Sequence, residues 1–273
     1  MRRAFALLAL AAPSAAVRWW RPAAPSAKGS LPPAAASALA DAKLDDQWQF
    51  VLQQKGVSVW KACEKDEASS ETQAPMAIKS SVEVGVPASY LTDLILTRDY
   101  DLARRFNPTL DGGEDLEWFD GKRERISYVR TKPVLFMRPR DFVLRVRRED
   151  TKDGVQLVTN TPATHGRAPP VSGCVRGSIS GLHLVEPRGA STCQYTSVHQ
   201  MDPAGTVPIF VVNWFALRRP LQYMVALRDL AEERHATDEE ARAEEESTQA
   251  TIMRPLRRAR NALKRRIGRA PIA

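Results

Sequence analysis

The sequence predicts an α+β domain in which an antiparallel β-sheet curls around one long buried helix. Candidate strands rich in β-branched residues follow one another between residues 56 and 201, with few helices among them. Turn sequences such as Asp120-Gly121 and Asp153-Gly154 favour hairpins between neighbouring strands. An apolar helix is predicted over Val207–Leu230, and because it is apolar on more than one side, it must be largely buried. We therefore expect the sheet to wrap around this helix.

The other elements follow in a simple order. Strands are predicted at residues 56–60 and 78–84, and two short helices at residues 90–95 and 101–106. Six further strands are predicted at residues 115–119, 125–131, 141–148, 155–161, 175–185 and 192–201. Pro220 should kink the long helix near its middle, because proline removes a backbone donor and clashes with the preceding turn. A kinked helix against a curled sheet leaves room for a cavity, although a filled core would give the same sequence pattern.

Composition limits the kinds of site that the chain can hold. Hydrophobic residues make up 43% of the 273 residues, which is enough for a sizeable core. The three cysteines are scattered and no CxxC or HExxH motif is present, so neither a disulfide framework nor a metal site is expected. The longest apolar stretch, residues 5–12, is far shorter than the roughly 20 residues that span a bilayer. We expect no transmembrane helix in the mature protein and no cofactor.

The net charge of +8 is concentrated in the two ends of the chain. Residues 1–40 carry five Lys or Arg and residues 254–273 carry eight, with no acidic residue in either segment. Without these thirteen charges, residues 41–253 have a net charge of −5. This mildly acidic middle of the chain argues against a basic groove for nucleic acid, and the basic tail lacks interleaved aromatic residues. Nucleic acid is therefore not an expected partner.

Residues 1–40 are predicted to be a targeting segment outside the fold. Arg2 and Arg3, the apolar residues 5–12 and the small residues 13–16 have the layout of a secretory signal peptide. Residues 17–40 are rich in Ala, Pro and Ser and hold arginines without acids, as organelle transit peptides do. Import into a plastid through the secretory route, a mitochondrial presequence and a leader with no address are all compatible with this composition.

Two segments of opposite charge follow the predicted domain, which ends at residue 231. Residues 232–253 are predicted to be an acidic spacer, either a solvated helix or a disordered segment. Residues 254–273 form a basic amphipathic tail suited to an anionic membrane surface, where each cation contributes on the order of 1 kcal/mol. The cations that we expect to contact the membrane are Arg257, Arg258, Lys264 and Arg265. The alternative is a frayed tail that binds nothing, because the apolar face of the helix is weak.

Several sequence landmarks occur in the order and spacing of a known family. They are Trp48, Gly56-Val57, Phe106-Asn107-Pro108, Pro139-Arg140-Asp141-Phe142-Val143, Val175-Arg176-Gly177 and Asp202-Pro203-Ala204-Gly205-Thr206-Val207-Pro208. Over residues 43–231 the chain resembles the START domain, the lipid-transfer module related to the steroidogenic acute regulatory protein. The resemblance implies a helix-grip fold, in which a curved antiparallel sheet surrounds a long C-terminal helix over a tunnel for one lipid. It also implies a carrier or sensor without catalytic activity.

Strand alternation suggests which residues would face such a tunnel. Phe142, Leu144 and Val146 share one face of their strand, and we expect this face to contact the lipid. Tyr128 and Val129, on the preceding strand, are further candidates. On the last predicted strand neither face is apolar throughout, so the sequence leaves its buried face open.

Three polar residues are candidates for contact with a lipid head group, and each has a simpler explanation. His199 lies on the last predicted strand, where most histidines are ordinary hydrogen-bonded side chains. Asn213 lies among apolar neighbours on the long helix, where its amide needs either a head group or a backbone carbonyl as partner. Arg104 could reach a phosphate, although an arginine at the end of a surface helix usually stays solvated.

Departures from the family leave the lipid unidentified. Phosphatidylcholine-transfer members hold the choline group in an aromatic cage, and Phe142 fits one cage position. Val129 and Ser180 stand where a tryptophan and a tyrosine are expected. Sterol-carrying members keep a buried acid–arginine pair, and Val146 occupies the arginine position. Neither head-group site is complete in this chain.

The sequence therefore predicts a monomeric lipid-binding protein that carries one lipid in an internal tunnel and transfers it between membranes. Two alternatives stay open. One is a membrane-tethered lipid sensor, and the other is a helix-grip enzyme that acts on a hydrophobic substrate. The chain has no GxSxG elbow, P-loop or GxGxxG motif that would support the enzyme.

Overall fold

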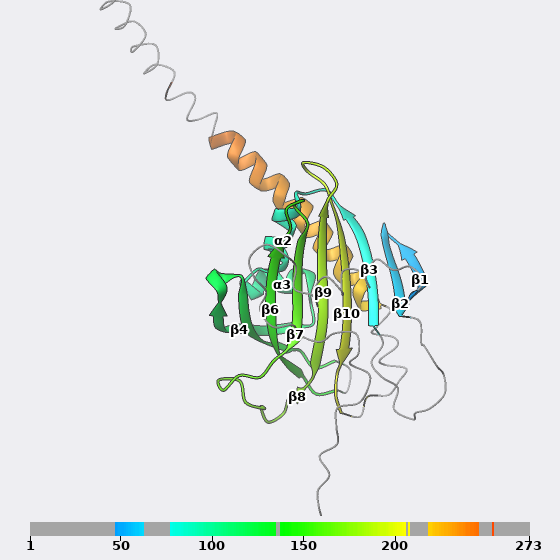
Figure 1. Ribbon diagram of the computed structural model, residues 1–273, viewed down its shortest axis with the longest axis vertical. Coiled ribbons are helices and arrows are strands. Elements are labelled where there is room, and N and C mark those ends of the chain that lie inside the picture. Colours follow the sequence, from blue (N-terminus) through cyan, green and yellow to red (C-terminus); the bar gives the residue numbers. More distant parts are fainter. Residues whose placement is uncertain are drawn as a thin grey trace, which may run out of the picture.

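Hairpin connections build one large sheet in the computed structural model, which describes residues 47–62, 77–134, 137–205, 207, 218–245 and 253. Its ten strands have the order β1-β2-β3-β10-β9-β7-β6-β5-β4, with β8 paired to β6. The β6–β8 pair is parallel and the other pairs are antiparallel. Figure 1 shows the sheet curving across the C-terminal helix, described over residues 218–245. The predicted α+β architecture is confirmed.

The predicted strands and both predicted short helices are present, with ends that differ by up to five residues. The strands are β1 (Trp48–Gln54), β2 (Val57–Ala62), β3 (Ala77–Val84), β4 (Leu110–Phe119), β5 (Glu124–Thr131), β6 (Arg140–Asp150), β7 (Gln156–Pro162), β8 (Val175–Arg176), β9 (Ser178–Pro187) and β10 (Cys193–Asp202). The short helical elements are α2 (Ala88–Ile95), α3 (Tyr100–Phe106) and the 3-10 turn η3 (Asp120–Lys122).

Strand β1 was not predicted, because its pattern is irregular. Burial does not alternate along this strand, and its register with β2 shifts between Phe50 and Leu52. Gly56, expected within a strand, instead forms the hairpin turn with Lys55. Lys55 and Gly56 have φ angles of 51° and 76°, the left-handed conformation that tight two-residue hairpin turns require.

The single strand predicted over residues 175–185 is in fact two strands. β8 pairs with β6, whereas β9 pairs with β7 and β10, and the chain changes partner at Gly177. A Cβ atom at Gly177 would collide with the ring of Phe142, so glycine permits this crossing. The adjacent Arg176 forms a bidentate ion pair with the buried Asp141, at 3.0 and 2.9 Å. This pair joins two of the sequence landmarks in space.

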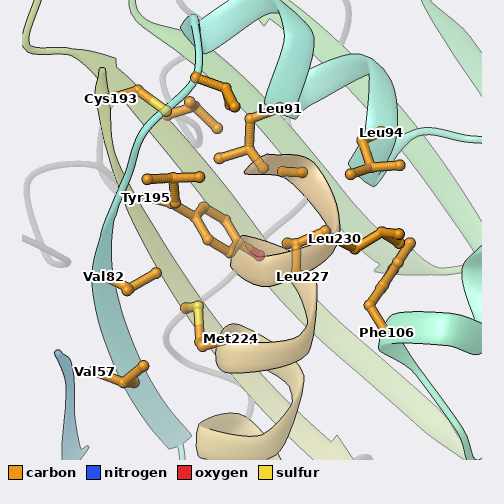
Figure 2. Packing of buried hydrophobic residues seen from close by; sticks show 14 of the residues in the cluster. Val57, Val82, Leu91, Leu94, Phe106, Cys193, Tyr195, Met224, Leu227 and Leu230 are labelled. Carbon is orange, nitrogen blue, oxygen red and sulfur yellow. The ribbon is translucent and has the colours of Figure 1, made fainter. Parts of the chain in front are cut away.

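The apolar face of the C-terminal helix packs on one end of the inner sheet face. Met224 and Leu227 of the helix lie in one buried cluster with Tyr195 of β10 and Val82 of β3 (Figure 2). Leu91 of α2 belongs to the same cluster, so α2 covers its outer end. This packing settles the buried face of β10, which the sequence had left open.

The C-terminal helix continues past the predicted domain end at residue 231. The spacer predicted for residues 232–253 is helical up to residue 245, and its first turns contact the domain. The backbone N–H of Gly85 donates to Glu232 at 2.8 Å, which ties the helix to the loop after β3. The hydroxyl of Tyr90 in α2 donates to Asp238, also at 2.8 Å. This part of the acidic segment is therefore an extension of the fold rather than a separate linker.

Some expectations fall on residues outside the described ranges. Among the described residues, no helix is long and apolar enough to cross a membrane. The start of the predicted long helix, residues 208–217, lies outside those ranges, as does the basic tail 254–273. The kink expected at Pro220 and the amphipathic tail therefore stay predictions.

Two methionines of opposite exposure test the helix packing. Met224 is fully buried, whereas Met201 is 49% exposed. We expect Met224→Ala to lower the free energy of unfolding by about 2–5 kcal/mol, because it removes buried apolar surface and leaves a cavity. Met201→Ala should lower it by less than about 1 kcal/mol. Urea unfolding followed by circular dichroism measures both changes, and equal losses would contradict the packing.

Candidate functional site

Beyond the helix contact, the inner sheet face continues as an apolar surface. Phe142, Leu144 and Val146 of β6 form it with Val158 of β7, and all four are buried. The half-buried residues packed against them are Leu96, Val129 and Ile179. The predicted alternation of β6 is confirmed, because Val143 belongs to a separate cluster on the other face.

Tyr128, expected among the lipid contacts together with Val129, lies on the other face of β5. It packs against the cluster that contains Leu116, Ile126 and Val143. Neighbouring residues of a strand point to opposite faces, so Tyr128 and Val129 cannot line the same surface. Val129 keeps the expected position and Tyr128 does not.

A group of polar side chains adjoins the apolar surface, and we call it the histidine cluster. Its members are Asn160, His183, Tyr195, Ser197 and His199. His183 Nδ1 lies 2.7 Å from Tyr195 Oη, and His183 Nε2 lies 3.2 Å from Asn160 Nδ2. An amide nitrogen only donates, so Nε2 accepts from Asn160 and the Nδ1–H donates to Tyr195. His199 Nδ1 lies 2.6 Å from Ser197 Oγ, and the two imidazole rings are 4.6 Å apart.

Strand register places the histidine cluster beside the apolar surface. His183 of β9 lies opposite Val158 of β7, which belongs to that surface. On the other side of β9, His199 of β10 lies opposite Gly181. A Cβ atom at Gly181 would collide with the His199 ring, so this glycine makes room for the imidazole.

Burial keeps the histidine cluster neutral near pH 7. It lowers the pKa of His183 well below its ordinary value of 6.5, and it lowers the pKa of His199 to about 4. It also raises the pKa of Tyr195 well above 10. Unlike His183, both Asn160 and His199 are only half-buried and keep some accessible surface. The cluster thus offers neutral hydrogen-bonding groups to a ligand.

The other predicted site residues do not join this cluster. Arg104 forms an ion pair with Asp101 and donates to the backbone carbonyl of Asp111 at 2.8 Å. These contacts tie α3 to the start of β4, and they give Arg104 a structural role. The predicted residues outside the described ranges are Asn213, Arg257, Arg258, Lys264 and Arg265.

His199 was predicted as a site residue, whereas His183 and Asn160 were not. The cluster draws on three strands, so it depends on how β7, β9 and β10 pair, and no single segment reveals it. The available signal was the alternation along β9, which places His183 and Gly181 on one face. Within the described ranges, no group of three or more His, Cys, Asp or Glu could hold a metal ion.

Acid titration tests the buried histidines. A histidine with a folded-state pKa below 6.5 is charged first in the unfolded chain, so stability falls as the pH drops from about 6.5 towards 4. We expect His199→Gln to reduce the stability lost between pH 7 and pH 5 by up to about 2 kcal/mol. His165→Gln, in the loop after β7, is the control. Urea unfolding at each pH gives the slopes, and identical slopes for wild type and His199→Gln would contradict the burial of this imidazole.

Sequence comparisons agree with the geometry of the fold. Residues 110–231 match the model of the START domain family. START domain-containing protein 10 from mouse and from human is 26% identical to the chain over 172 residues. This alignment covers 61% of the chain and 55% of the relative, so the chain spans about half the length of the curated relatives it matches.

Solved structures share the fold. Human STARD10 superposes with a TM-score of 0.65 at 19% identity, covering 75% of this chain and 81% of that chain. Human StAR-related lipid transfer protein 5 superposes with a TM-score of 0.64 at 21% identity, covering 74% and 94%. With its curved antiparallel sheet, its C-terminal helix and the match over residues 110–231, the chain is similar to the START domain family in sequence and shares its fold.

Proposed function

We propose that this protein binds one lipid against the inner sheet face and carries it between membranes. The observation that carries the proposal is the apolar surface of Phe142, Leu144, Val146 and Val158 beside the histidine cluster. Exposing one methylene group of a lipid to water costs about 0.8 kcal/mol of free energy. An apolar protein interior removes that cost during transit. Human StAR-related lipid transfer protein 5 shares the fold, which supports the same class of activity.

In this proposal the histidine cluster binds an uncharged polar group of the lipid. His199 and Asn160 have accessible surface, and burial holds His199 neutral, so the fitting partners are hydroxyl and ester carbonyl groups. A charged group placed here would lose its hydration without an opposite charge from His183 or His199 to compensate. The absence of an aromatic ring at Val129 agrees with a ligand whose choline group, if present, is not bound there. Ser180 does not bear on this point, because it lies on the opposite face of β9 from His183.

The geometry favours a carrier over an enzyme. The pKa of His183 lies well below 6.5 and that of Tyr195 well above 10, so neither changes protonation near neutral pH. Efficient acid–base catalysis needs a group whose pKa lies near the working pH. The Nδ1–H of His183 donates to the Tyr195 hydroxyl and its Nε2 accepts from Asn160, so both ring nitrogens of His183 are occupied.

Native mass spectrometry of the full chain, purified from a eukaryotic host, tests lipid binding directly. We expect one lipid per protein, and extraction should identify a molecule with a hydroxyl or ester carbonyl. A fluorescent-lipid transfer assay between two vesicle populations then tests transport. A protein that is isolated empty and takes up no lipid from vesicles would overturn the proposal.

A substitution that fills the inner surface should block lipid uptake. Val129 is half-buried and packs against the apolar surface, whereas Val171 is 44% exposed in a loop. We expect Val129→Trp to lower the bound lipid at least about tenfold, because the indole occupies the space that a lipid chain needs. Val171→Trp adds the same side chain outside and should leave the lipid content unchanged. Uptake that Val129→Trp does not reduce would place the ligand elsewhere.

The basic tail is the part of the chain that we propose to contact anionic membranes. Replacing its four expected contact residues by glutamine removes four positive charges, and we expect weaker association with vesicles that contain anionic phospholipid. The residues are Arg257, Arg258, Lys264 and Arg265. Binding to phosphatidylcholine vesicles and the content of bound lipid should not change. Vesicle co-sedimentation measures binding to the anionic and the phosphatidylcholine vesicles, and native mass spectrometry measures the bound lipid. Unaltered binding to the anionic vesicles would exclude the tail as the contact.

A further inference from the structure

A second candidate site lies outside the histidine cluster, in a cavity of about 410 Å³ between α2, η3 and the edge of the sheet. This volume is in the range of small-molecule sites. Its charged lining is dominated by cations: Arg98, Lys122, Arg123, Arg125 and Arg148. The carboxylates that line it are Asp93 and Asp150. We call this cavity the basic pocket.

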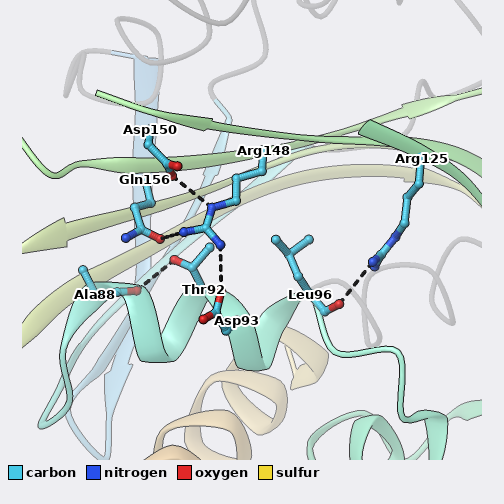
Figure 3. A network of polar contacts seen from close by, with 8 residues as sticks. All are labelled: Ala88, Thr92, Asp93, Leu96, Arg125, Arg148, Asp150 and Gln156. Atoms are coloured by element: carbon cyan, nitrogen blue, oxygen red, sulfur yellow. Dashed lines mark hydrogen bonds and ion pairs between the residues drawn. The ribbon is translucent and has the colours of Figure 1, made fainter. Parts of the chain in front are cut away.

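Arg148 forms one wall of the basic pocket and is fully engaged. Its guanidinium donates to Asp93 of α2 at 2.7 Å, to Asp150 at 3.0 Å and to Gln156 of β7 at 3.0 Å (Figure 3). Both lining carboxylates are therefore used by this one arginine. The network fixes α2 against the sheet and leaves the other four cations without a carboxylate of the lining.

Arg98 and Arg125 also line the basic pocket, and both pack against Trp118. Their guanidinium carbons are 5.4 and 5.3 Å from the centre of the indole ring. Both also contact Asp115, each at 3.3 Å, and Arg125 donates to the backbone carbonyl of Leu96 at 3.2 Å (Figure 3). One carboxylate thus serves two arginines, which leaves an excess of positive charge.

Lys122 and Arg123 stand at the rim of the basic pocket without such partners. Lys122 ends the tight turn η3 and Arg123 follows it; Asp120, Gly121 and Lys122 have φ angles of 45°, 59° and 72°, and the N–H of Arg123 donates to the carbonyl of Asp120 at 3.0 Å. Both side chains are exposed, and neither forms an ion pair within the described part of the chain. Counting Asp115, five cations face three carboxylates, whereas residues 41–231 as a whole are nearly balanced, with 25 Lys or Arg and 24 Asp or Glu.

We propose that the basic pocket binds the phosphate group of a ligand. Guanidinium forks match phosphate oxygens, and the two unpaired rim cations can close on a group that carries more than one negative charge. The pocket lining also includes Leu96 and Val146; Val146 is part of the apolar surface of the inner sheet face, and Leu96 packs against that surface. A ligand with a phosphate and an apolar part could therefore occupy both. The pocket is independent of the histidine cluster, so it does not depend on the lipid-transfer proposal.

Titration of the full-length protein with two soluble probes tests this site. The probes are inorganic phosphate and monomeric dihexanoyl phosphatidic acid, followed by calorimetry and by the NMR signal of the Trp118 indole N–H. The indole N–H signal that disappears in the Trp118→Phe variant is the signal of Trp118. We expect a shift of this signal on binding and weaker binding at high salt. Binding of both probes assigns the site to phosphate itself, and binding of the lipid alone assigns it to a phospholipid head group.

A matched pair of double variants locates the binding. Lys122→Ser with Arg123→Ser should weaken probe binding at least about tenfold, because it removes both unpaired cations. Arg167→Ser with Arg188→Ser removes the same charge from two other exposed positions and should change the affinity less than about twofold. The proposal is overturned if no probe shifts the Trp118 signal, or if both double variants lose affinity equally. Lipid content of the same variants shows whether the lipid-transfer proposal holds separately.

Discussion

The main constraint on the structure is the burial of the apolar face of the C-terminal helix against one end of the inner sheet face. Met224 and Leu227 reach full burial only because Tyr195 and its neighbours present a matching surface. Strand side chains alternate with a period of two, so fixing Tyr195 inward also fixes Ser197 and His199 inward. The contact that closes one end of the interior therefore determines which polar groups line the rest.

Burying those polar groups has a free-energy cost that hydrogen bonds within the sheet offset. Tyr195 illustrates the balance, since its ring packs in the apolar cluster while its hydroxyl accepts from His183. Asn160 fixes the tautomer of His183 from the other side. Tyr195, His183 and Asn160 lie between the helix contact and the apolar surface, so they form a fixed polar boundary on the inner sheet face. A ligand would meet both chemistries within one interior.

Local patterns predicted most elements of the fold, because hairpin turns and alternation act within a few residues. The inner face of β6 follows from alternation alone. Features that depend on pairing between distant strands were out of reach, including the contact of His183 with Asn160 and the change of partner at Gly177. Tyr128 was predicted to line the same surface as its neighbour Val129, but adjacent residues of a strand point to opposite faces. Here a local rule was available and the prediction did not follow it.

The apolar surface joins two sites of different chemistry. Val158 links it to the neutral histidine cluster, and Val146 links it to the basic pocket with its surplus of cations. These residues come from the adjacent strands β6 and β7, so one rigid sheet fixes the distance between the sites. An amphiphile with both an uncharged polar group and a phosphate could then be oriented by the sheet, because only one end of the molecule fits each site. On this view the sheet fixes the ligand's orientation, and the helix that packs on the same face closes one end of the interior.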